Sequence, residues 1–214
     1  MKNIDDYENI IFDLGGVILN LDYNKTVEEY RNHIKNLDET VFFGKETQLP
    51  FFSDYEIGSI STKDFIHRFN EYYKLKISFE EFCRCWNAMI FDFPIERILL
   101  LDRLRKTGKK IFLLSNINEL HEFAVEDSFG KLGLGTRFFD YFHNVYYSHR
   151  VGLRKPTLEI FEHVIKDNGI EKNETIFIDD SLHHVIGSRN FGIEAIHLEK
   201  PSTIETHPFF AGVM

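Results

Sequence analysis

The sequence is poor in cysteine and in positive charge. Cys83 and Cys85 are its two cysteines. They lie too close together for an ordinary disulfide, so we expect both to be small, buried apolar residues. Because 25 Lys and Arg stand against 34 Asp and Glu, the formal net charge is −9. Phosphate backbones and anionic membranes are bound through a basic face, so we expect neither nucleic acid nor a membrane surface as a partner.

Long hydrophobic runs are also missing. No apolar stretch of the sequence is long enough to cross a bilayer. The segment 1–9 is acidic and polar, unlike a secretory signal peptide, so we expect a soluble protein of the cytoplasm. The 214 residues, 43% of them hydrophobic and 22 of them Phe, are enough for one sizeable domain or a domain with a smaller insert. The patterns indicate no particular oligomeric state.

Five short apolar runs predict buried strands. They are Ile10–Leu14, Lys110–Leu114, Asn144–Tyr147, Thr175–Ile178 and Glu194–His197. Helical patterns separate them from Ile95 onward, and this alternation predicts an α/β fold with a doubly wound, parallel, Rossmann-like sheet. Gly108 and Gly169 are placed to end helices, and Pro156 is placed to begin one.

Residues 20–92 interrupt this alternation. They contain no convincing strand but three helix-like segments, Asn24–Ile34, Lys63–Tyr73 and Phe79–Met89. We therefore expect an α/β core domain of residues 1–19 plus 93–214 and a small α-helical cap domain of residues 20–92. The insert follows the first strand, at the edge where open α/β sheets bind ligands, so it is expected to form a lid.

Two strands are followed directly by acidic residues. Asp13 follows an apolar run, where a carboxylate is costly to desolvate unless a cation or hydrogen bonds compensate it. Asp179 and Asp180 follow another run, and adjacent acids favour a divalent cation between them and a third acid. Each has a structural alternative: Asp13 could bond to the Gly15–Gly16 turn, and Asp180 or Ser181 could cap the next helix.

Two further strand ends carry groups suited to phosphate. Ser115 and Asn116 offer a hydroxyl and an amide after the second strand. Lys155, before Pro156, is expected at a helix start, where its ammonium and the helix N-terminus could face an anion. Each pair taken alone is equally typical of an ordinary turn. The order of all four groups along the chain carries the information.

That order resembles the haloacid dehalogenase-like hydrolase superfamily over nearly the whole chain. The motifs are Phe12-Asp13-Leu14-Gly15-Gly16-Val17, Leu114-Ser115-Asn116, Lys155-Pro156 and Phe177-Ile178-Asp179-Asp180-Ser181. The insert is similar to the α-helical cap that this family places after its first motif. More narrowly, the first motif, the run Ser115–His121, the run Gly152–Pro156 and the cap segment Glu56–Ser61 resemble the subgroup containing bacterial α-D-glucose-1-phosphate phosphatase.

The resemblance implies a nucleophile and a metal site. Asp13 would attack phosphorus and carry an aspartyl-phosphate intermediate. Mg²⁺ would be held by Asp13, the backbone carbonyl of Gly15 and Asp180, with Asp179 helping directly or through water. The ion would neutralise phosphate charge and align the reactants.

It also implies the phosphate-binding residues. Ser115 and Asn116 would bind the phosphoryl oxygens, and Lys155 would offset the negative charge of carboxylates and phosphate. Asp13, Ser115 and Lys155 are thus the expected catalytic residues. The implied function is a magnesium-dependent phosphatase acting on a small phosphate ester, such as the sugar phosphate α-D-glucose 1-phosphate.

The sequence departs from the family at Gly15, where most of its phosphatases have a second aspartate for general acid–base catalysis. Such help is typically worth about 10²–10⁴-fold. Three accounts are open. The substrate has a good leaving group, as an anomeric phosphate does; another group replaces the aspartate, with Glu56, Asp22, His183 and His184 as candidates; or the protein is weakly active. The two histidines are otherwise expected as ordinary polar residues of the helix after Asp180.

Other functions compete with a phosphatase. A 2-haloacid dehalogenase shares the nucleophile and lacks the second aspartate, but it needs no metal and has no use for Asp179 and Asp180. A phosphomutase needs the acid–base group missing at Gly15. A weakly active or inactive domain that only binds a phosphometabolite is disfavoured by the intact Asp13 and Lys155.

Four aromatic residues of the insert have two interpretations. They are Phe51, Phe52, Tyr55 and Trp86. They could stack on a sugar ring, but aromatic residues in a small helical cap more often form its core.

Overall fold

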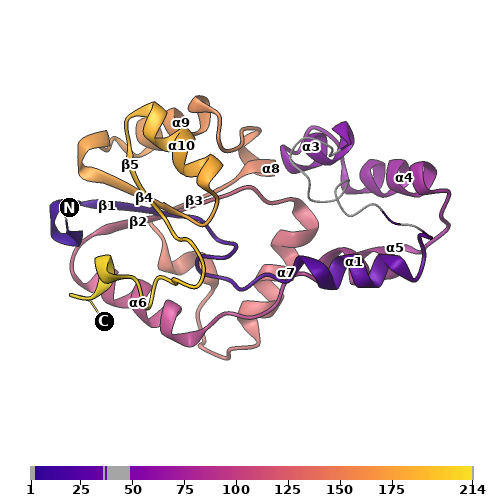
Figure 1. The fold of residues 1–214 in the computed structure, drawn as a ribbon, viewed down its shortest axis with the longest axis horizontal. Helices are drawn as coiled ribbons and strands as arrows, with labels where there is room; N and C mark the ends of the chain where they lie inside the picture. The colour runs from indigo at the N-terminus through magenta and orange to yellow at the C-terminus, as the bar shows by residue number, and fades with distance from the viewer. Residues whose placement is uncertain (1–2, 36, 38–48, 214) are drawn as a thin grey trace.

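The computed structural model describes residues 3–35, 37 and 49–213, and within them five parallel strands form one sheet in the order β3-β2-β1-β4-β5 (Figure 1). The strands are β1 (Asn9–Phe12), β2 (Lys110–Ser115), β3 (Asn144–Tyr147), β4 (Thr175–Asp179) and β5 (Glu194–His197). The predicted parallel α/β sheet is therefore confirmed. β1 ends two residues before the predicted Leu14, although the amide of Asp13 still donates to the carbonyl of Ile178 at 2.9 Å.

Helices cover both faces of the sheet, which explains why its strands are apolar throughout. One face packs on α6 (Ile95–Lys106) and α7 (Glu119–Gly130), and the other on α9 (Leu158–Asn168) and α10 (Leu182–Phe191). Ile10 and Phe12 of β1 belong to the first apolar cluster, whereas Ile11 between them belongs to the second. The short elements are η1 (Ile4–Asp6), η2 (Phe138–Tyr141), α8 (Ser148–Val151), η3 (Lys172–Glu174) and η4 (Pro208–Phe210).

The helix boundaries confirm two sequence predictions and correct one. Gly169 ends α9 with a left-handed backbone, and Gly108 follows the end of α6. The helix start expected at Pro156 is wrong, because α9 begins at Leu158. The side chain of Asn116 explains the delay. Its amide accepts from the backbone N–H of Lys155 and donates to its carbonyl, both at 2.9 Å, and so holds this segment against the end of β2.

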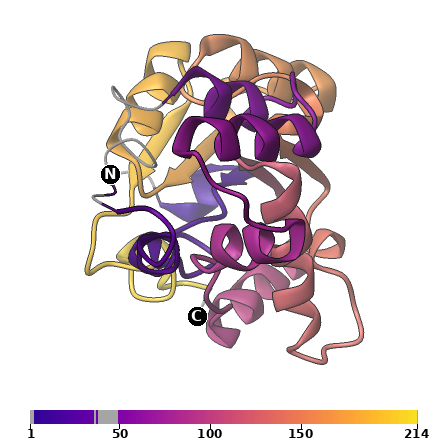
Figure 2. The same cartoon turned by 90° about the vertical axis from the view of Figure 1, so that its right-hand side faces the viewer.

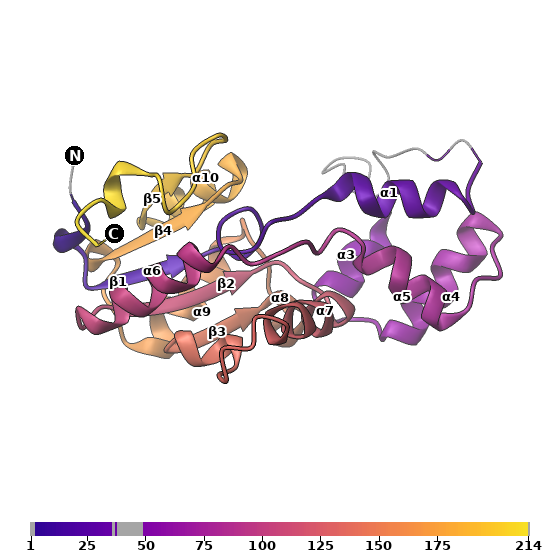
Figure 3. The same cartoon turned by 90° about the horizontal axis from the view of Figure 1, so that it is seen from below.

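The insert forms a separate group of helices beyond the carboxyl ends of the strands (Figures 1 and 3). These are α1 (Tyr23–Arg31), α3 (Pro50–Glu56), α4 (Thr62–Tyr73) and α5 (Phe79–Asn87), which we call the cap helices. The three predicted helices are present, although α1 and α5 end before Ile34 and Met89. The short α3 was not predicted. It has seven residues, and its N-cap, Leu49, makes no side-chain cap hydrogen bond. Figure 2 shows the group end-on.

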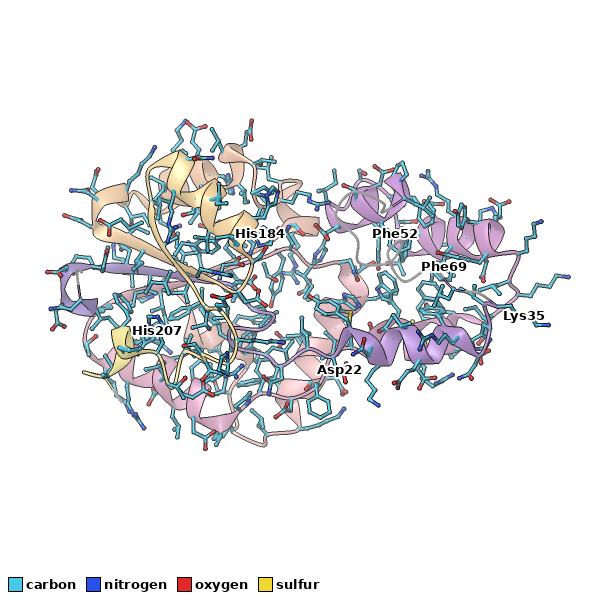
Figure 4. All side chains as sticks on the ribbon, in the orientation of Figure 1. Asp22, Lys35, Phe52, Phe69, His184 and His207 are labelled. Atoms are coloured by element: carbon cyan, nitrogen blue, oxygen red, sulfur yellow. The ribbon has the colours of Figure 1, made fainter. Side chains whose placement is uncertain are left out.

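The cap helices share an aromatic core of their own. The Phe65 ring lies 5.1 Å from Trp86 and 5.8 Å from Phe82, edge to face in both pairs. Phe52 and Phe69 lie in the same cluster (Figure 4), which Leu120 of α7 completes from the other side. This separate core supports our proposal that residues 20–92 form a cap domain.

The two segments that connect the insert to the sheet run side by side in opposite directions. Leu21 and Ile90 form an isolated antiparallel bridge. The amide of Asn20 donates to the carbonyl of Asp92 at 2.9 Å, and that of Asp22 donates to the carbonyl of Met89 at 2.9 Å. We call residues 20–22 and 89–92 the stem. The insert is thus joined to the core by a paired ribbon.

The structure bears on the two cysteines and on the lack of long hydrophobic runs. Cys85 is buried as expected, whereas Cys83 is half-buried, because residues two apart on a helix point to roughly opposite sides. Both are free thiols. Within the described residues, no helix combines the length and the apolar character needed to span a membrane.

Replacement of Phe65 by Ala is expected to lower the free energy of unfolding by about 3–5 kcal/mol, because it removes a fully buried ring from the cap cluster. Urea titration followed by the fluorescence of Trp86, the single tryptophan, and by far-UV circular dichroism measures the change. Tyr72→Ala, on the same helix but 53% exposed, is the control and should cost far less. Equal losses in the two variants would contradict the central place of Phe65.

Candidate active site

A cavity of about 470 Å³ separates the carboxyl edge of the sheet from the cap helices. The core contributes Asp13, Leu14, Gly15, Leu19, Ser115, Asn116, Ile117, Asn118, His121, Val125, Arg154 and Asp180 to its wall. The stem and the cap helices contribute Leu21, Tyr23, Phe52, Glu56, Trp86, Met89 and Ile90. Residues from distant parts of the sequence therefore meet at one edge of the sheet, as expected for parallel strands.

A buried lysine lies at the centre of the polar residues. The side chain of Lys155 is fully buried, and its Nζ lies 2.5 Å from Asp13 Oδ1 and 2.7 Å from Asp179 Oδ2. A buried ammonium is tolerated only when it is paired in this way. Because its Nζ lies behind the carboxylates, Lys155 does not reach the cavity wall in this structure.

The three acids gather around this lysine. Asp13, Asp179 and Asp180 each offer one carboxylate oxygen, and these three atoms all lie within 4.8 Å of one another. Burial raises the pKa of Asp13, the charge of Lys155 opposes this, and the two other carboxylates raise it further. Burial likewise raises the pKa of Asp180, with a further contribution from Asp179. For Asp179 burial is outweighed by the charge of Lys155 and the hydrogen bond from His184, so its pKa is lowered.

This group fits a divalent cation. One ammonium faces three carboxylates, so the cluster holds excess negative charge, and its donors are hard oxygen atoms of the kind that Mg²⁺ prefers. Gly15 lies beside them on the cavity wall, where its carbonyl can join the set. Gly16 admits the third acid: its φ is +76°, and a Cβ there would lie 2.2 Å from Asp180 Oδ2. Only a glycine at this position leaves room for the Asp180 carboxylate.

Asp179 is held more tightly than its two neighbours. It is fully buried, and it accepts hydrogen bonds from Lys155, from the backbone N–H of Ser181 at 2.7 Å and from His184 Nδ1 at 3.0 Å. The capping alternative does not apply, because Ser181 is the N-cap of α10 and makes no side-chain cap hydrogen bond. His184, expected to be an ordinary polar residue, instead turns back from α10 toward the site (Figure 4).

The phosphate-binding pair predicted after β2 lies on the cavity wall. Ser115 is buried there beside Asn116. Asn116 also has a structural task that the sequence analysis did not include, namely its two hydrogen bonds to the backbone of Lys155. The Asn116 amide therefore joins the end of β2 to the segment that carries Lys155. One of its two N–H groups is left for a ligand.

Of the four candidates for the missing acid, only Glu56 lies on the cavity wall. Asp22 instead caps α1, where its side chain accepts from the backbone N–H of Asn24 at 3.1 Å. His183 and His184 follow Asp180 but do not line the cavity.

The aromatic residues of the insert are mainly core. All four pack in or against the cap cluster, and Phe52 and Trp86 also line the cavity. Trp86 stacks on His121 of α7, with ring centroids 5.1 Å apart.

The sequence analysis missed Arg154 as a site residue. Its Nε lies 3.1 Å from Glu56 Oε1, and its Nη1 donates to Ser53 Oγ at 2.9 Å. The sequence feature that could have indicated Arg154 as a site residue was its position directly before Lys155.

Replacement of Gly16 by Ala is expected to raise the dissociation constant for Mg²⁺ by about 10- to 100-fold, because the new methyl displaces the Asp180 carboxylate. Isothermal titration calorimetry measures the affinity. Gly108→Ala is a matched control, since Gly108 also has positive φ but open space around its Cβ position. Both variants should lose about 1–2 kcal/mol of stability. Unchanged Mg²⁺ affinity in Gly16→Ala would show that metal binding does not depend on the space left by this glycine.

Comparison with known proteins agrees with this geometry. Residues 10–198 match the sequence profile of haloacid dehalogenase-like hydrolases. A D-ribitol-5-phosphate phosphatase from Bacteroides thetaiotaomicron is 28% identical over 193 residues, covering 90% of this chain and 92% of the relative. A sesquiterpene phosphatase from Aspergillus oryzae is 27% identical over 203 residues, 90% of each chain.

A solved structure of an enzyme of the same family from Bacteroides thetaiotaomicron, an aspartate-to-alanine variant in complex with magnesium and inorganic phosphate, superimposes with a TM-score of 0.84. It is 29% identical in sequence, and the match covers 91% of this chain and 95% of that one. The profile, the relatives and the fold agree with one another. The chain belongs to the haloacid dehalogenase-like hydrolase family.

Proposed function

We propose that this protein hydrolyses small sugar or polyol phosphates through an aspartyl-phosphate formed on Asp13. The chain is a Mg²⁺-dependent phosphoric monoester hydrolase. This follows from its family, from two phosphatase relatives that match over nearly their whole length, and from a structural neighbour bound to magnesium and phosphate. One observation carries the assignment of the nucleophile. Asp13 stands on the wall of the cavity with one oxygen held by buried Lys155 and with Asp180 beside it.

Asp13 must attack as a carboxylate. Burial raises its pKa, but the ammonium of Lys155 and a cation between Asp13 and Asp180 both favour the charged form. When bound, Mg²⁺ neutralises charge on the phosphoryl oxygens and aligns them with the nucleophile. An Asp13 oxygen then forms a bond to phosphorus as the bond from phosphorus to the substrate's ester oxygen breaks. Water later cleaves the aspartyl-phosphate and regenerates the carboxylate.

The other residues act by position and charge. We propose that Ser115 and Asn116 donate hydrogen bonds to the phosphoryl oxygens from the cavity wall. Lys155 holds Asp13 in place and contributes its charge from behind, and Asp179 positions Lys155. Such fixed charges in a partly buried site are worth more than the same charges in solvent.

The cavity favours a small substrate with polar groups. Its volume of about 470 Å³ lies in the range of ordinary small-molecule sites. Glu56, Arg154 and Asn118 provide hydrogen-bonding groups for hydroxyls, while Phe52 and Trp86 provide flat apolar surface. The ribitol phosphatase relative supports a hydroxyl-rich substrate, and α-D-glucose 1-phosphate remains our specific candidate within this class.

Replacement of Asp13 by Asn is expected to lower kcat for phosphate release by at least about 10³-fold, because it removes the nucleophile. Removal of Mg²⁺ with a chelator should abolish the activity, and added Mg²⁺ should restore it. Phosphate release from a panel of sugar and polyol phosphates measures both effects. Asp102→Asn, an exposed acid of α6, is the control. Equal, slow release by the wild type and Asp13→Asn would refute the proposed function.

The lack of a side chain at Gly15 favours an anomeric phosphate, whose leaving group needs less protonation than a plain alcohol. We therefore expect kcat/KM for α-D-glucose 1-phosphate to exceed that for D-glucose 6-phosphate. D-ribitol 5-phosphate completes the comparison, since it has the same kind of primary-alcohol ester as D-glucose 6-phosphate. A clear preference for the alcohol phosphates would contradict the leaving-group argument and would leave the phosphatase assignment intact.

A further inference from the structure

The position that would carry the family's acid–base aspartate has no room for a side chain here. A Cβ on Gly15 would lie 2.5 Å from the Cδ1 atom of Leu21 in the stem. An alkoxide leaving group still needs a proton, and the water that attacks the aspartyl-phosphate still needs a base. The proton donor must therefore be sought elsewhere on the cavity wall.

Most titratable residues described on that wall are unsuited to this task. Asp13 and Asp180 are already assigned to attack and metal binding, and the guanidinium of Arg154 is paired with Glu56 and Ser53. Burial and the nearby carboxylates raise the pKa of Tyr23, which disfavours its use as a base. Burial lowers the pKa of His121 to about 4, and its two ring nitrogens already contact Asn118 at 3.1 Å and the carbonyl of Trp86 at 3.1 Å.

Glu56 remains, and its position is fixed. It is the last residue of α3, it lines the cavity, and its buried Oε1 has no hydrogen-bond partner apart from the ion-pair contact with Arg154. Its backbone carbonyl accepts from Ser148 Oγ at 2.7 Å. The same hydroxyl lies 3.1 Å from the carbonyl of Ile117, just after Ser115 and Asn116. Ser148 thus fixes Glu56 relative to the phosphate-binding loop.

The surroundings of Glu56 act on its carboxyl group in opposite directions. Burial raises the pKa of this group, while the charges of Arg154 and Lys155 oppose the rise. A carboxyl group on the cavity wall can donate a proton in one step and accept one in the next.

We propose that Glu56, on the cap, is the general acid and base of this phosphatase; the inference rests on the proposed function. As Asp13 attacks phosphorus, the Glu56 carboxyl proton passes to the departing ester oxygen, which leaves as a neutral alcohol. The resulting Glu56 carboxylate then takes a proton from the water that attacks the aspartyl-phosphate. Inorganic phosphate leaves, and Asp13 and protonated Glu56 are restored.

The test uses the isosteric variant Glu56→Gln and two esters that differ in their need for an acid. The value of kcat/KM reports phosphoryl transfer to Asp13. For D-ribitol 5-phosphate, an alkyl ester, it should fall by about 10²–10⁴-fold. For p-nitrophenyl phosphate, whose phenolate leaves without protonation, it should fall by less than about tenfold. With this aryl ester kcat should still drop and a burst of nitrophenol should appear, because water attack has lost its base.

Each result has a defined meaning. A similar loss of kcat/KM for both esters would overturn the proposal and make Glu56 a positioning residue, and no loss for the alkyl ester would also overturn it. Asp54→Asn removes another acid of α3, which pairs with Arg68 and does not line the cavity, and it should leave both values within about twofold of the wild type. If the wild type cleaves neither ester nor any sugar phosphate, the proposed function fails instead, and the role of Glu56 falls with it.

Discussion

The ammonium group of Lys155 is the interaction on which the site depends. It is fully buried between Asp13 and Asp179, two carboxylates from strands that neighbour each other in the sheet. Without this positive charge, burial of Asp13 and Asp179 beside a third acid, Asp180, would be unfavourable. The surrounding structure keeps the lysine in place: Asn116 binds its backbone on both sides, and Ser181 and His184 fix the carboxylate behind it. Asp13, Asp179, Lys155 and the loop after β2 are therefore parts of one hydrogen-bonded unit.

The sequence was sufficient for the parts of the molecule that follow from local patterns. Buried parallel strands are continuous apolar runs, so Asp13 and Asp180 could be placed near strand ends without a structure, although the end of β1 was predicted two residues late. The insert was recognisable for the same reason, because the strand–helix alternation stops there. The glycine at position 16 was visible as a turn, although its second use, to make room for a carboxylate, was not.

The missed features depend on contacts between distant segments. The helix expected at Pro156 starts later because a side chain 39 residues earlier in the chain holds the backbone of Lys155. His184 reaches the site because the first turn of α10 directs this side chain toward Asp179. The pairing of Arg154 with Glu56 joins the core to the cap. Local propensity contains none of this information.

The stem has a consequence for how this protein can change over evolutionary time. Leu21 lies on one strand of this paired ribbon, and its side chain occupies the space beside Gly15. An aspartate could return to position 15 only together with a smaller residue at position 21, so the two positions form a coupled pair. The same ribbon carries the chain into the cap helices. A lineage that exchanged this pair would move the proposed proton donor from the cap to the core domain, and selection on the cap would then be free to follow the substrate alone.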